Sequence, residues 1–341
     1  LLMRLSYRIA EITAAQEWAI VRVAQPPLAV VAGYYVILFS GYYMVRRDTP
    51  EFRPKSRARF CVHWALGVAL LAASAFGDRL TSRPLRIWFF DVGQGDSTLI
   101  QFPSGQSLLV DAGHVTPDLG RMVVGPQLRA LGVWPLDELV ATHADADHIG
   151  GIPWLLRNHR VGRLVEGTNS PPRDALITAL NEACSATAVR RLKVTAGEPI
   201  RLDSRTMVEV LNPPANPPPD WSNNDQSVVL LIRHGKFSAL LMADAQEVVE
   251  KRLADSGIGR VDVLKVGHHG SRTSSSPGFL KAVRPDVAVI SCGRRNRYGH
   301  PHPAVIARLD ALGCRTLRTD RHGAILVESD GESYRVITAR K

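Results

Sequence analysis

The sequence predicts a layered α/β domain preceded by an N-terminal α-helical membrane segment. From Leu85 onward, short runs of β-branched and aromatic residues alternate with helical stretches, which is the pattern of sheets buried under helices. Upstream, residues 25–45 and 60–77 contain no Asp, Glu, Lys or Arg over lengths that reach across a hydrocarbon core of roughly 30 Å. We therefore expect a membrane-associated helical region over residues 1–83 and an α/β domain over residues 84–341.

The N-terminal region is predicted to lie in the cytoplasmic membrane as a multi-pass hairpin whose helices contact lipid. Residues 46–59, between the two candidate spans, carry six basic residues against two acidic ones, and short basic loops stay on the cytoplasmic side. This topology would place the α/β domain on the outer face. For residues 25–45 a buried helix of a larger bundle is the alternative, while residues 4–24 suit an interfacial helix or an ordinary solvated one.

Composition argues against disorder and against a nucleic-acid surface that covers the whole chain. Hydrophobic residues make up 45% and charged residues 22% of the 341 positions, the balance of a folded protein. The formal net charge of +10 divides into +6 for residues 1–83, with 11 Lys/Arg against 5 Asp/Glu, and +4 for residues 84–341, with 31 against 27. Cations that flank membrane segments explain this basicity better than a DNA-binding face does. The four cysteines have no metal-finger spacing and are predicted to be structural.

Local runs predict the elements of the α/β domain in order. Apolar runs predict strands at residues 85–92, 97–102, 107–113, 138–143, 227–234, 238–245, 261–269 and 286–293. Intervening stretches predict helices at residues 151–159, 173–188, 245–256, 277–283 and 303–312. The proline-rich residues 212–221 predict an extended loop.

The sharpest chemical signal is THADADHIGG, residues 142–151, directly after a predicted strand. Four potential metal ligands fall within six residues: His143, Asp145, Asp147 and His148. On a strand-to-helix loop this spacing lets alternate side chains converge on one or two cations. A polar loop with an acidic helix cap is the alternative.

This motif resembles the H-x-H-x-D-H hallmark of the metallo-β-lactamase superfamily, with Asp145 in place of the second histidine. DVGQGDS, LLVDAG, VLKVGHHGS and RYGHPHP, which begin at residues 91, 108, 263 and 297, make the chain similar to one branch. That branch is the C-terminal domain of ComEC-type DNA-uptake proteins of bacterial competence. The resemblance covers residues 86 to about 338. It implies an αββα sandwich, preceded by the last membrane segments of a channel whose upstream portion is expected to be missing from this chain.

The resemblance also assigns ligands outside the motif. Asp244 matches the carboxylate that bridges two metals, although Met242 and Ala243 replace the usual Thr-Gly. An aspartate that caps the following helix is the alternative. Either His268 or His269 matches the last histidine ligand, and the sequence does not choose between them.

The superfamily's mid-chain histidine has no clear counterpart in this chain. The corresponding stretch offers Asn223, Asn224, Asp225 and Ser227 instead. Because carboxylate also replaces imidazole at Asp145, the ligand set moves toward oxygen-preferring ions. We expect one or two divalent ions, with Mn²⁺ favoured and Zn²⁺ or Mg²⁺ as alternatives.

Asp147 and four further residues receive roles around the expected metals. Asp147 is predicted to act in catalysis as a ligand that orients the attacking water, which two metals activate while they hold the phosphoryl oxygens. His302 is a candidate to protonate the leaving group, with simple packing as the alternative. Asp111 is expected to brace the metal loop from behind. Gly93 and Gly95 suit a tight turn.

Hydroxyl, guanidinium and imidazole groups near these motifs suit contacts to a phosphate backbone. Solvated surface residues are the alternative for each one taken singly. The candidate substrate-binding residues are Ser271, Arg272, Thr273, Arg294, Arg295, Arg297 and His300.

The favoured function, as the resemblance implies, is a metal-dependent nuclease that acts on DNA, single-stranded or double-stranded, during uptake across the cytoplasmic membrane. One alternative is a hydrolase of small esters, lactones or lactams. Another is a non-catalytic module along the DNA path, with a depleted metal site.

Overall fold

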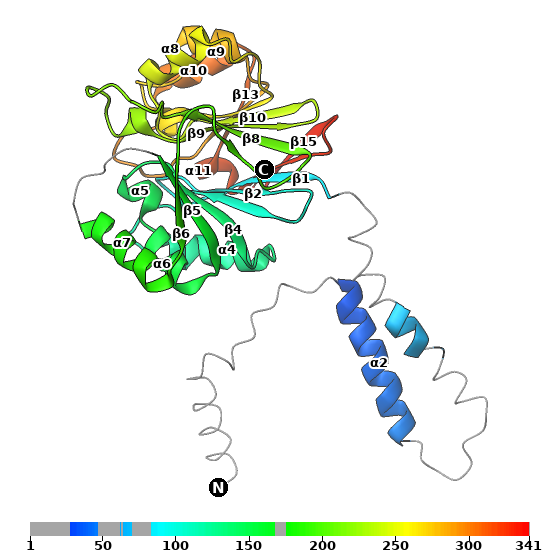
Figure 1. Cartoon of the computed structure of the whole chain (residues 1–341). Helices are drawn as coiled ribbons and strands as arrows, with labels where there is room; N and C mark the ends of the chain where they lie inside the picture. Colours follow the sequence, from blue (N-terminus) through cyan, green and yellow to red (C-terminus); the bar gives the residue numbers. More distant parts are fainter. Residues whose placement is uncertain (1–27, 47–61, 63, 70–82, 168–174, 341) are drawn as a thin grey trace. The chain divides into compact units, whose positions relative to one another are not determined.

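The structure is a computed structural model that describes residues 28–46, 62, 64–69, 83–167 and 175–340 (Figure 1). The chain divides into two compact units. One is built from residues 1–82 and 128–133, and the other from Arg83–Gln127 and Trp134–Lys341.

The first unit contains helix α2, which spans Leu28–Arg46. Helix formation is thereby confirmed for most of residues 25–45. No helix in the described ranges combines the length and the apolar character that crossing a bilayer requires, so the structure does not support the transmembrane assignment of residues 25–45. Of residues 60–77, only 62 and 64–69 are described, and they are helical. The predictions for residues 4–24 and 47–59 lie outside the described residues.

The second unit is built on two β-sheets. The first has the strand order β15-β14-β1-β2-β3-β4-β5-β6, and β3 to β6 run parallel. The second has the order β13-β12-β11-β10-β9-β8-β7, and β10 to β13 run parallel. The first sheet comprises β1 (Leu85–Phe89), β2 (Thr98–Gln101), β3 (Ser107–Val110), β4 (Leu136–Ala141), β5 (Val161–Gly167), β6 (Arg190–Val194), β14 (Ile325–Ser329) and β15 (Tyr334–Thr338). The second comprises β7 (Pro199–Ile200), β8 (Thr206–Asn212), β9 (Val229–His234), β10 (Phe237–Leu241), β11 (Val263–Lys265), β12 (Val287–Ile290) and β13 (Arg315–Arg318).

Helices cover the outer faces of both sheets, as Figure 1 shows for α6 and α7 beside β4 to β6 and for α8, α9 and α10 over the second sheet. The predicted helices appear as α6 (Ile152–Asn158), α7 (Ala175–Thr187), α8 (Glu247–Asp255), α9 (Pro277–Val283) and α10 (Pro303–Ala311). Shorter helical turns are η2 (Gly120–Val124), α4 (Gly125–Ala130), α5 (Ala146–Ile149), η3 (Asn224–Gln226), η4 (Gly267–Gly270) and α11 (Thr319–His322). The predicted αββα sandwich is therefore confirmed.

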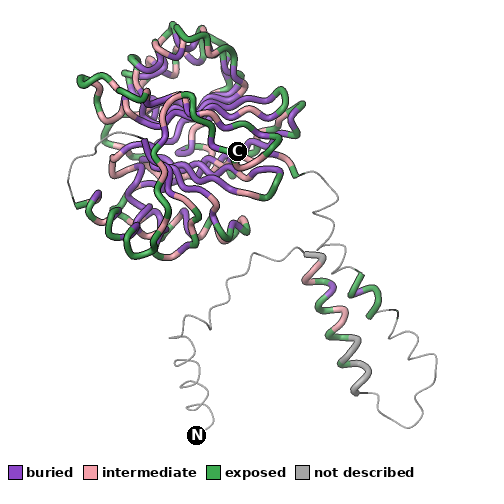
Figure 2. The backbone as a smooth tube through the Cα atoms, in the orientation of Figure 1, coloured by how far each residue is buried: buried purple, intermediate pink, exposed green. Residues whose placement is uncertain are grey.

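The main core lies between the two sheets, where most residues are coloured as buried in Figure 2. Leu85, Ile87 and Phe89 of β1 belong to the same buried cluster as Val208 and Val210 of β8. Each fully buried side chain of this kind contributes roughly 1.5–3 kcal/mol. A second cluster joins the outer face of the second sheet to α8, α9 and α10. Packing in these two clusters holds the carboxyl ends of β4, β10 and β11 in fixed positions.

Several strands were not predicted from the sequence: β5, β6, β7, β8, β13, β14 and β15. The edge strand β6 shows why, because its sequence RRLKV is largely exposed and charged and lacks an apolar run. The strand β8 alternates buried residues with residues that are only partly buried or exposed, but Pro213 and Pro214 follow it directly and mask the pattern.

Candidate metal centre

The metal loop, residues 142–148, leaves the carboxyl end of β4 and enters α5. Asp145 stands at the N-cap position of α5 with an extended backbone, but its side chain makes no capping bond. Instead its Oδ2 lies 3.4 Å from His143 Nε2, and its Oδ1 accepts a 2.6 Å hydrogen bond from the Asn223 amide. The ring centroids of His143 and His148 lie 4.2 Å apart. The loop thus gathers two imidazoles and a carboxylate on one side.

Asp244, just after β10, links the metal loop to the second sheet. Its Oδ1 lies 3.2 Å from His148 Nε2, and its Oδ2 lies 3.5 Å from His269 Nε2. His269 Nε2 also lies 3.2 Å from Asp147 Oδ2. Four overlapping groups result, each with ligand atoms within 4.8 Å of one another. The two ligand groups that contain residues of the metal loop without Asp96 are His143 with His148 and Asp244, and Asp147 with His148 and His269. The other two add Asp96, once to Asp111 and His148 and once to Asp244 and His269.

Four buried atoms of the two ligand groups without Asp96 have no hydrogen-bond partner among the residues that the structure describes. They are Asp244 Oδ1 and the Nε2 atoms of His143, His148 and His269. A buried polar atom left without a partner costs about 1–3 kcal/mol, so atoms that face one another in this way call for a common partner. Imidazole nitrogens and carboxylate oxygens are the ligands that divalent transition metals take. The residues present therefore fit a divalent metal ion.

Burial and charge oppose each other at this centre. Burial lowers the pKa of His148, but the carboxylates of Asp244 and Asp111 outweigh it and raise that pKa well above its usual value. Burial raises the pKa of Asp244, but positive charge on His269 and His148 holds it well below its usual value. Burial raises the pKa of Asp147, but the His269 ring, whose Nε2 lies 3.2 Å from Asp147 Oδ2, and the charge on His148 outweigh burial and lower that pKa. A cation that binds here meets ionised carboxylates and displaces protons from imidazoles.

Asp111 braces the metal loop from behind, in the place where the sequence predicts it. Its backbone takes the left-handed conformation, with φ 60°, directly after β3. Its Oδ1 accepts a 2.9 Å hydrogen bond from the Thr142 backbone, and its Oδ2 accepts one of 2.7 Å from the Thr142 hydroxyl. The same Oδ2 lies 2.7 Å from His148 Nδ1. Because a carboxylate only accepts, Nδ1 carries the proton and Nε2 faces the centre.

A buried ion pair lies behind His269, and sequence reasoning assigned no role to either partner. The Lys265 ammonium bonds to Asp96 Oδ2, and both side chains are almost wholly buried. Asp96 Oδ1 lies 3.7 Å from His269 Nδ1. The only sequence signals are a lysine inside an apolar run and an acidic residue after Gly95, whose backbone φ is +124°. The pair ties the β1–β2 loop to the end of β11.

The structure distinguishes His268 from His269. Both lie in η4 with left-handed backbone, φ 48° and 53°. His269 is buried, and its Nδ1 lies 3.1 Å from the Ser291 carbonyl, so its Nε2 points to the centre. The His268 ring lies nearer the rim, where its Nε2 is 3.4 Å from the Asn224 amide and 3.8 Å from Asp244 Oδ2. Burial lowers the pKa of His268, despite the negative charge of Asp244.

The predicted substrate-binding residues lie in two loops that follow η4 and β12. In the first, Ser271 is buried and its hydroxyl lies 3.2 Å from that of Thr273, while Arg272 is exposed. In the second, Arg294 donates a 2.9 Å hydrogen bond from Nε to the Asp320 carbonyl, while Arg295 and Arg297 are exposed.

Of the two loop histidines, His300 lies beside the metal centre. Its ring centroid is 5.6 Å from that of His268 and 6.3 Å from that of His269. Burial and the positive charge of those two rings lower the pKa of His300 to about 4. His302 instead stands at the N-cap of α10, where its Nδ1 accepts a 3.2 Å hydrogen bond from the Ala304 backbone. One nitrogen of His302 is therefore used to cap α10. The histidine whose ring contacts His268 and His269 is His300.

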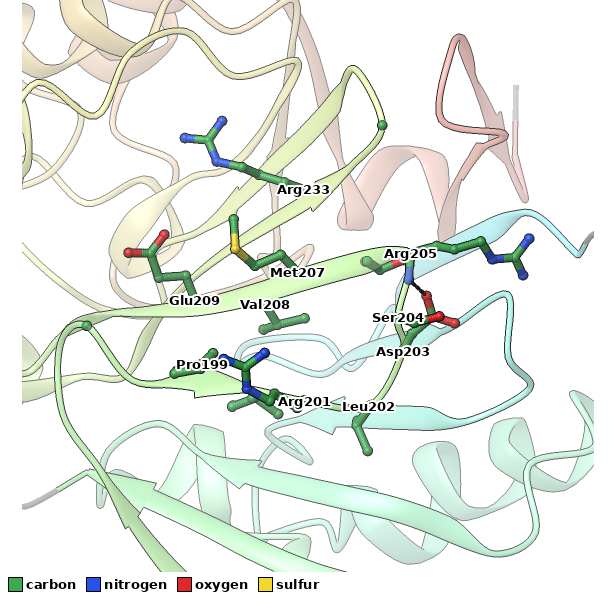
Figure 3. A pocket seen from close by; sticks show the side chains of 14 residues that line it. Pro199, Arg201, Leu202, Asp203, Ser204, Arg205, Met207, Val208, Glu209 and Arg233 are labelled. Atoms are coloured by element: carbon green, nitrogen blue, oxygen red, sulfur yellow. Dashed lines mark hydrogen bonds between the residues drawn. The ribbon is translucent and has the colours of Figure 1, made fainter.

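A broad open groove lies elsewhere, along β7 and β8 (Figure 3). It is lined by Arg201, Arg205 and Arg233 together with Asp203 and Glu209, and none of the described residues that line it is a histidine. The groove therefore lacks the donor set of the metal centre and does not contribute to it.

A two-sheet αββα sandwich with a buried His/Asp centre at its strand ends defines a metal-binding hydrolase fold. The chain belongs to the Metallo-beta-lactamase superfamily, because residues 90–294 match that family. The family resemblance inferred from the sequence is thus confirmed.

Three bacterial proteins illustrate what this chain is similar to. ComE operon protein 3 of Bacillus subtilis (strain 168) is 36% identical over 252 residues, which are 69% of this chain and 32% of that protein. Recombination protein 2 of Haemophilus influenzae is 33% identical over 81% of this chain and 33% of its own length. Competence protein ComA of Neisseria gonorrhoeae is 34% identical over 70% of this chain and 31% of its own length. The chain therefore spans about a third of the length of these relatives.

Proposed function

We propose that this chain is a metal-dependent phosphodiesterase that cleaves DNA during its uptake across the cytoplasmic membrane. The observation that carries the proposal is the convergence of His143, His148, Asp244 and His269, whose buried unpartnered atoms face one another. Similarity to proteins named for competence supports DNA as the substrate. Exposed arginines in the two loops beside the centre suit a phosphate backbone.

The residues divide the work by their position. His143, His148, Asp147, Asp244 and His269 would hold one or two ions, with Mn²⁺ favoured over Zn²⁺ or Mg²⁺ by the carboxylate content. When bound, a divalent ion supplies Lewis acidity that activates water and polarises the phosphoryl group. Asp147, with 26% of its side chain exposed, is the carboxylate that can also orient the attacking water.

His300 would orient the substrate or its leaving group from the rim. Its neutral ring lies against His268 and His269 without entering either ligand group. Arg272, Arg295 and Arg297 would contact flanking phosphates.

The cellular setting is part of the same proposal. Residues 84–341 would carry the activity on the outer face of the membrane. Residues 1–83 would contact lipid beside an upstream channel portion.

The test is a nuclease assay of the purified 341-residue chain, stripped of metal by chelation and reloaded with Mn²⁺, Mg²⁺ or Zn²⁺. We expect cleavage of labelled single- or double-stranded DNA with at least one of these ions. Asp147→Ala should lower the cleavage rate at least roughly 100-fold, which is the loss seen when a residue that only hydrogen-bonds to a metal ligand is removed. The surface variant Asp203→Ala, which alters a carboxylate of the Figure 3 groove, serves as the matched control.

Two results would replace the proposal. Hydrolysis of lactones or lactams without DNA cleavage would favour a small-molecule hydrolase. A chain that retains no stoichiometric divalent metal would favour a non-catalytic module along the DNA path.

A further inference from the structure

An exposed aromatic side chain, Tyr298, lies beside the metal centre in the loop between β12 and α10. More than half of its surface, 56%, is open to solvent. Its ring stacks on His300, with centroids 5.8 Å apart and planes at 24°. His300 in turn stacks on His269, at 6.3 Å and 27°. Three rings thus form a ladder that leads from solvent to a buried member of the metal centre.

The loop holds this ladder in a defined position. The Asn296 amide clamps His300, because its Nδ2 donates a 2.6 Å hydrogen bond to the His300 carbonyl while its Oδ1 accepts one of 2.8 Å from the His300 N–H. Asn296 also donates a 2.8 Å bond to the Gly293 carbonyl. The backbone on both sides of Tyr298 is therefore fixed, so its ring is presented at low entropic cost.

A cation accompanies the exposed ring. The Arg297 guanidinium carbon lies 5.3 Å from the Tyr298 ring centroid, and Nη2 donates a 3.2 Å hydrogen bond to the Tyr298 hydroxyl. Arg297 is exposed. A stacking surface with an adjoining positive charge is the combination that binds an unpaired nucleobase together with its phosphate.

A single exposed tyrosine is ordinary on a protein surface. What distinguishes Tyr298 is its alignment through His300 with His269, which places the platform one ring away from the centre. A phosphodiester beside the metal centre has its attached base within reach of such a ring. Stacking tolerates any base but requires that base to be unpaired, so this arrangement selects single strands.

We propose that Tyr298, supported by His300 and Arg297, is a stacking platform for an unpaired base next to the scissile phosphate, and that it makes single-stranded DNA the preferred substrate. This inference rests on the proposed nuclease function. Tyr298 acts as a binding and positioning residue, and the metal centre performs the chemistry.

The experiment compares an oligothymidylate with an oligonucleotide of equal length built from abasic tetrahydrofuran units, using the full chain. The first readout is the affinity for each strand in the presence of a chelator, followed through the fluorescence anisotropy of a terminal dye. The second is the KM and kcat of cleavage with Mn²⁺. We expect the wild type to prefer the base-bearing strand by about tenfold, mainly through KM. Tyr298→Ala should remove this preference, and Tyr298→Phe should keep it.

Trp134→Ala is the matched control, because that ring is 44% exposed and precedes the end of β4 opposite to the metal loop. It should behave as the wild type. Equal binding of both strands by the wild type, or an unchanged preference in Tyr298→Ala, would overturn the platform. Failure to cleave any strand, with base-dependent binding that still requires Tyr298, would instead overturn the nuclease function and leave the platform standing.

Discussion

Asp111→Asn tests whether a buried carboxylate sets the protonation of His148. The wild-type carboxylate can only accept, so it accepts from Thr142 twice and from His148 Nδ1. An amide at this position keeps one acceptor and gains a donor. If the remaining oxygen accepts from the Thr142 N–H, the new N–H group faces His148 Nδ1. In the neutral form of His148, which is the form that binds metal, the proton then lies on Nε2 instead of Nδ1, and Nε2 is the atom that faces Asp244 at 3.2 Å.

The magnitude follows from the role of that atom. A protonated Nε2 cannot bind metal, and it gains a hydrogen bond to Asp244 that binding must break. Loss of a carboxylate that hydrogen-bonds to a metal-binding histidine lowers metal affinity roughly 10- to 100-fold, which is about 1.4–2.7 kcal/mol of binding free energy. The opposite amide orientation sets two donors against each other at Thr142 and costs about 1–3 kcal/mol of stability instead.

The assay is titration of the metal-free chain with Mn²⁺ and Zn²⁺ against a chromogenic chelator, together with urea unfolding. Asp137→Asn is the matched control, because Asp137 joins the same two strands at their other end by accepting from the Ser107 N–H at 2.8 Å. Its metal affinity should equal that of the wild type. An Asp111→Asn protein with wild-type metal affinity and wild-type stability would refute the reasoning.

Three further predictions concern a turn that packs on the metal loop, an ion pair of β14 and the ligand type at residue 145. Gly95→Ala should lower the free energy of unfolding, measured in urea, by more than about 2 kcal/mol, because the φ of Gly95 is +124° and a Cβ there would collide with the Asp147 carbonyl. The control Gly93→Ala, at a position with open space around it, should lower that free energy by about 1 kcal/mol. Burial raises the pKa of Glu328, but two guanidinium groups outweigh it and lower that pKa. Glu328→Gln should therefore cost about 1 kcal/mol at pH 7, and the difference should shrink as the pH falls below about 4.5; a difference that grows toward acid would contradict it. Asp145→His should raise affinity for Zn²⁺ relative to Mn²⁺, and an unchanged ratio in chelator competition would count against a ligand role.

Asp147→Ala in the nuclease assay and Tyr298→Ala in the stacking assay complete the set. The first addresses the metal centre itself, and the second addresses the selection of substrate beside it. Their outcomes are separable because Tyr298 lies outside both ligand groups.

The sequence by itself determined the layered class of the second unit and the position of the metal loop. His143, Asp145, Asp147 and His148 are close in space because they are close in the chain, so local spacing suffices to find them. Long apolar runs likewise predict β4, β9, β10 and β11. Strands with short or charged sequences, such as β6, were not predicted, because pairing with a neighbouring strand stabilises them more than their own composition does.

Only the tertiary structure decided which distant groups complete the centre. Lys265 and Asp96 meet across 169 positions of sequence, and the local signal of each residue does not reveal that the two form a pair. The choice of His269 over His268, and of His300 over His302 beside the rings, depends on left-handed turns and a helix cap that orient the side chains. Such contacts depend on how two sheets stack, and that stacking is a property of the whole buried core, which no single run of residues encodes.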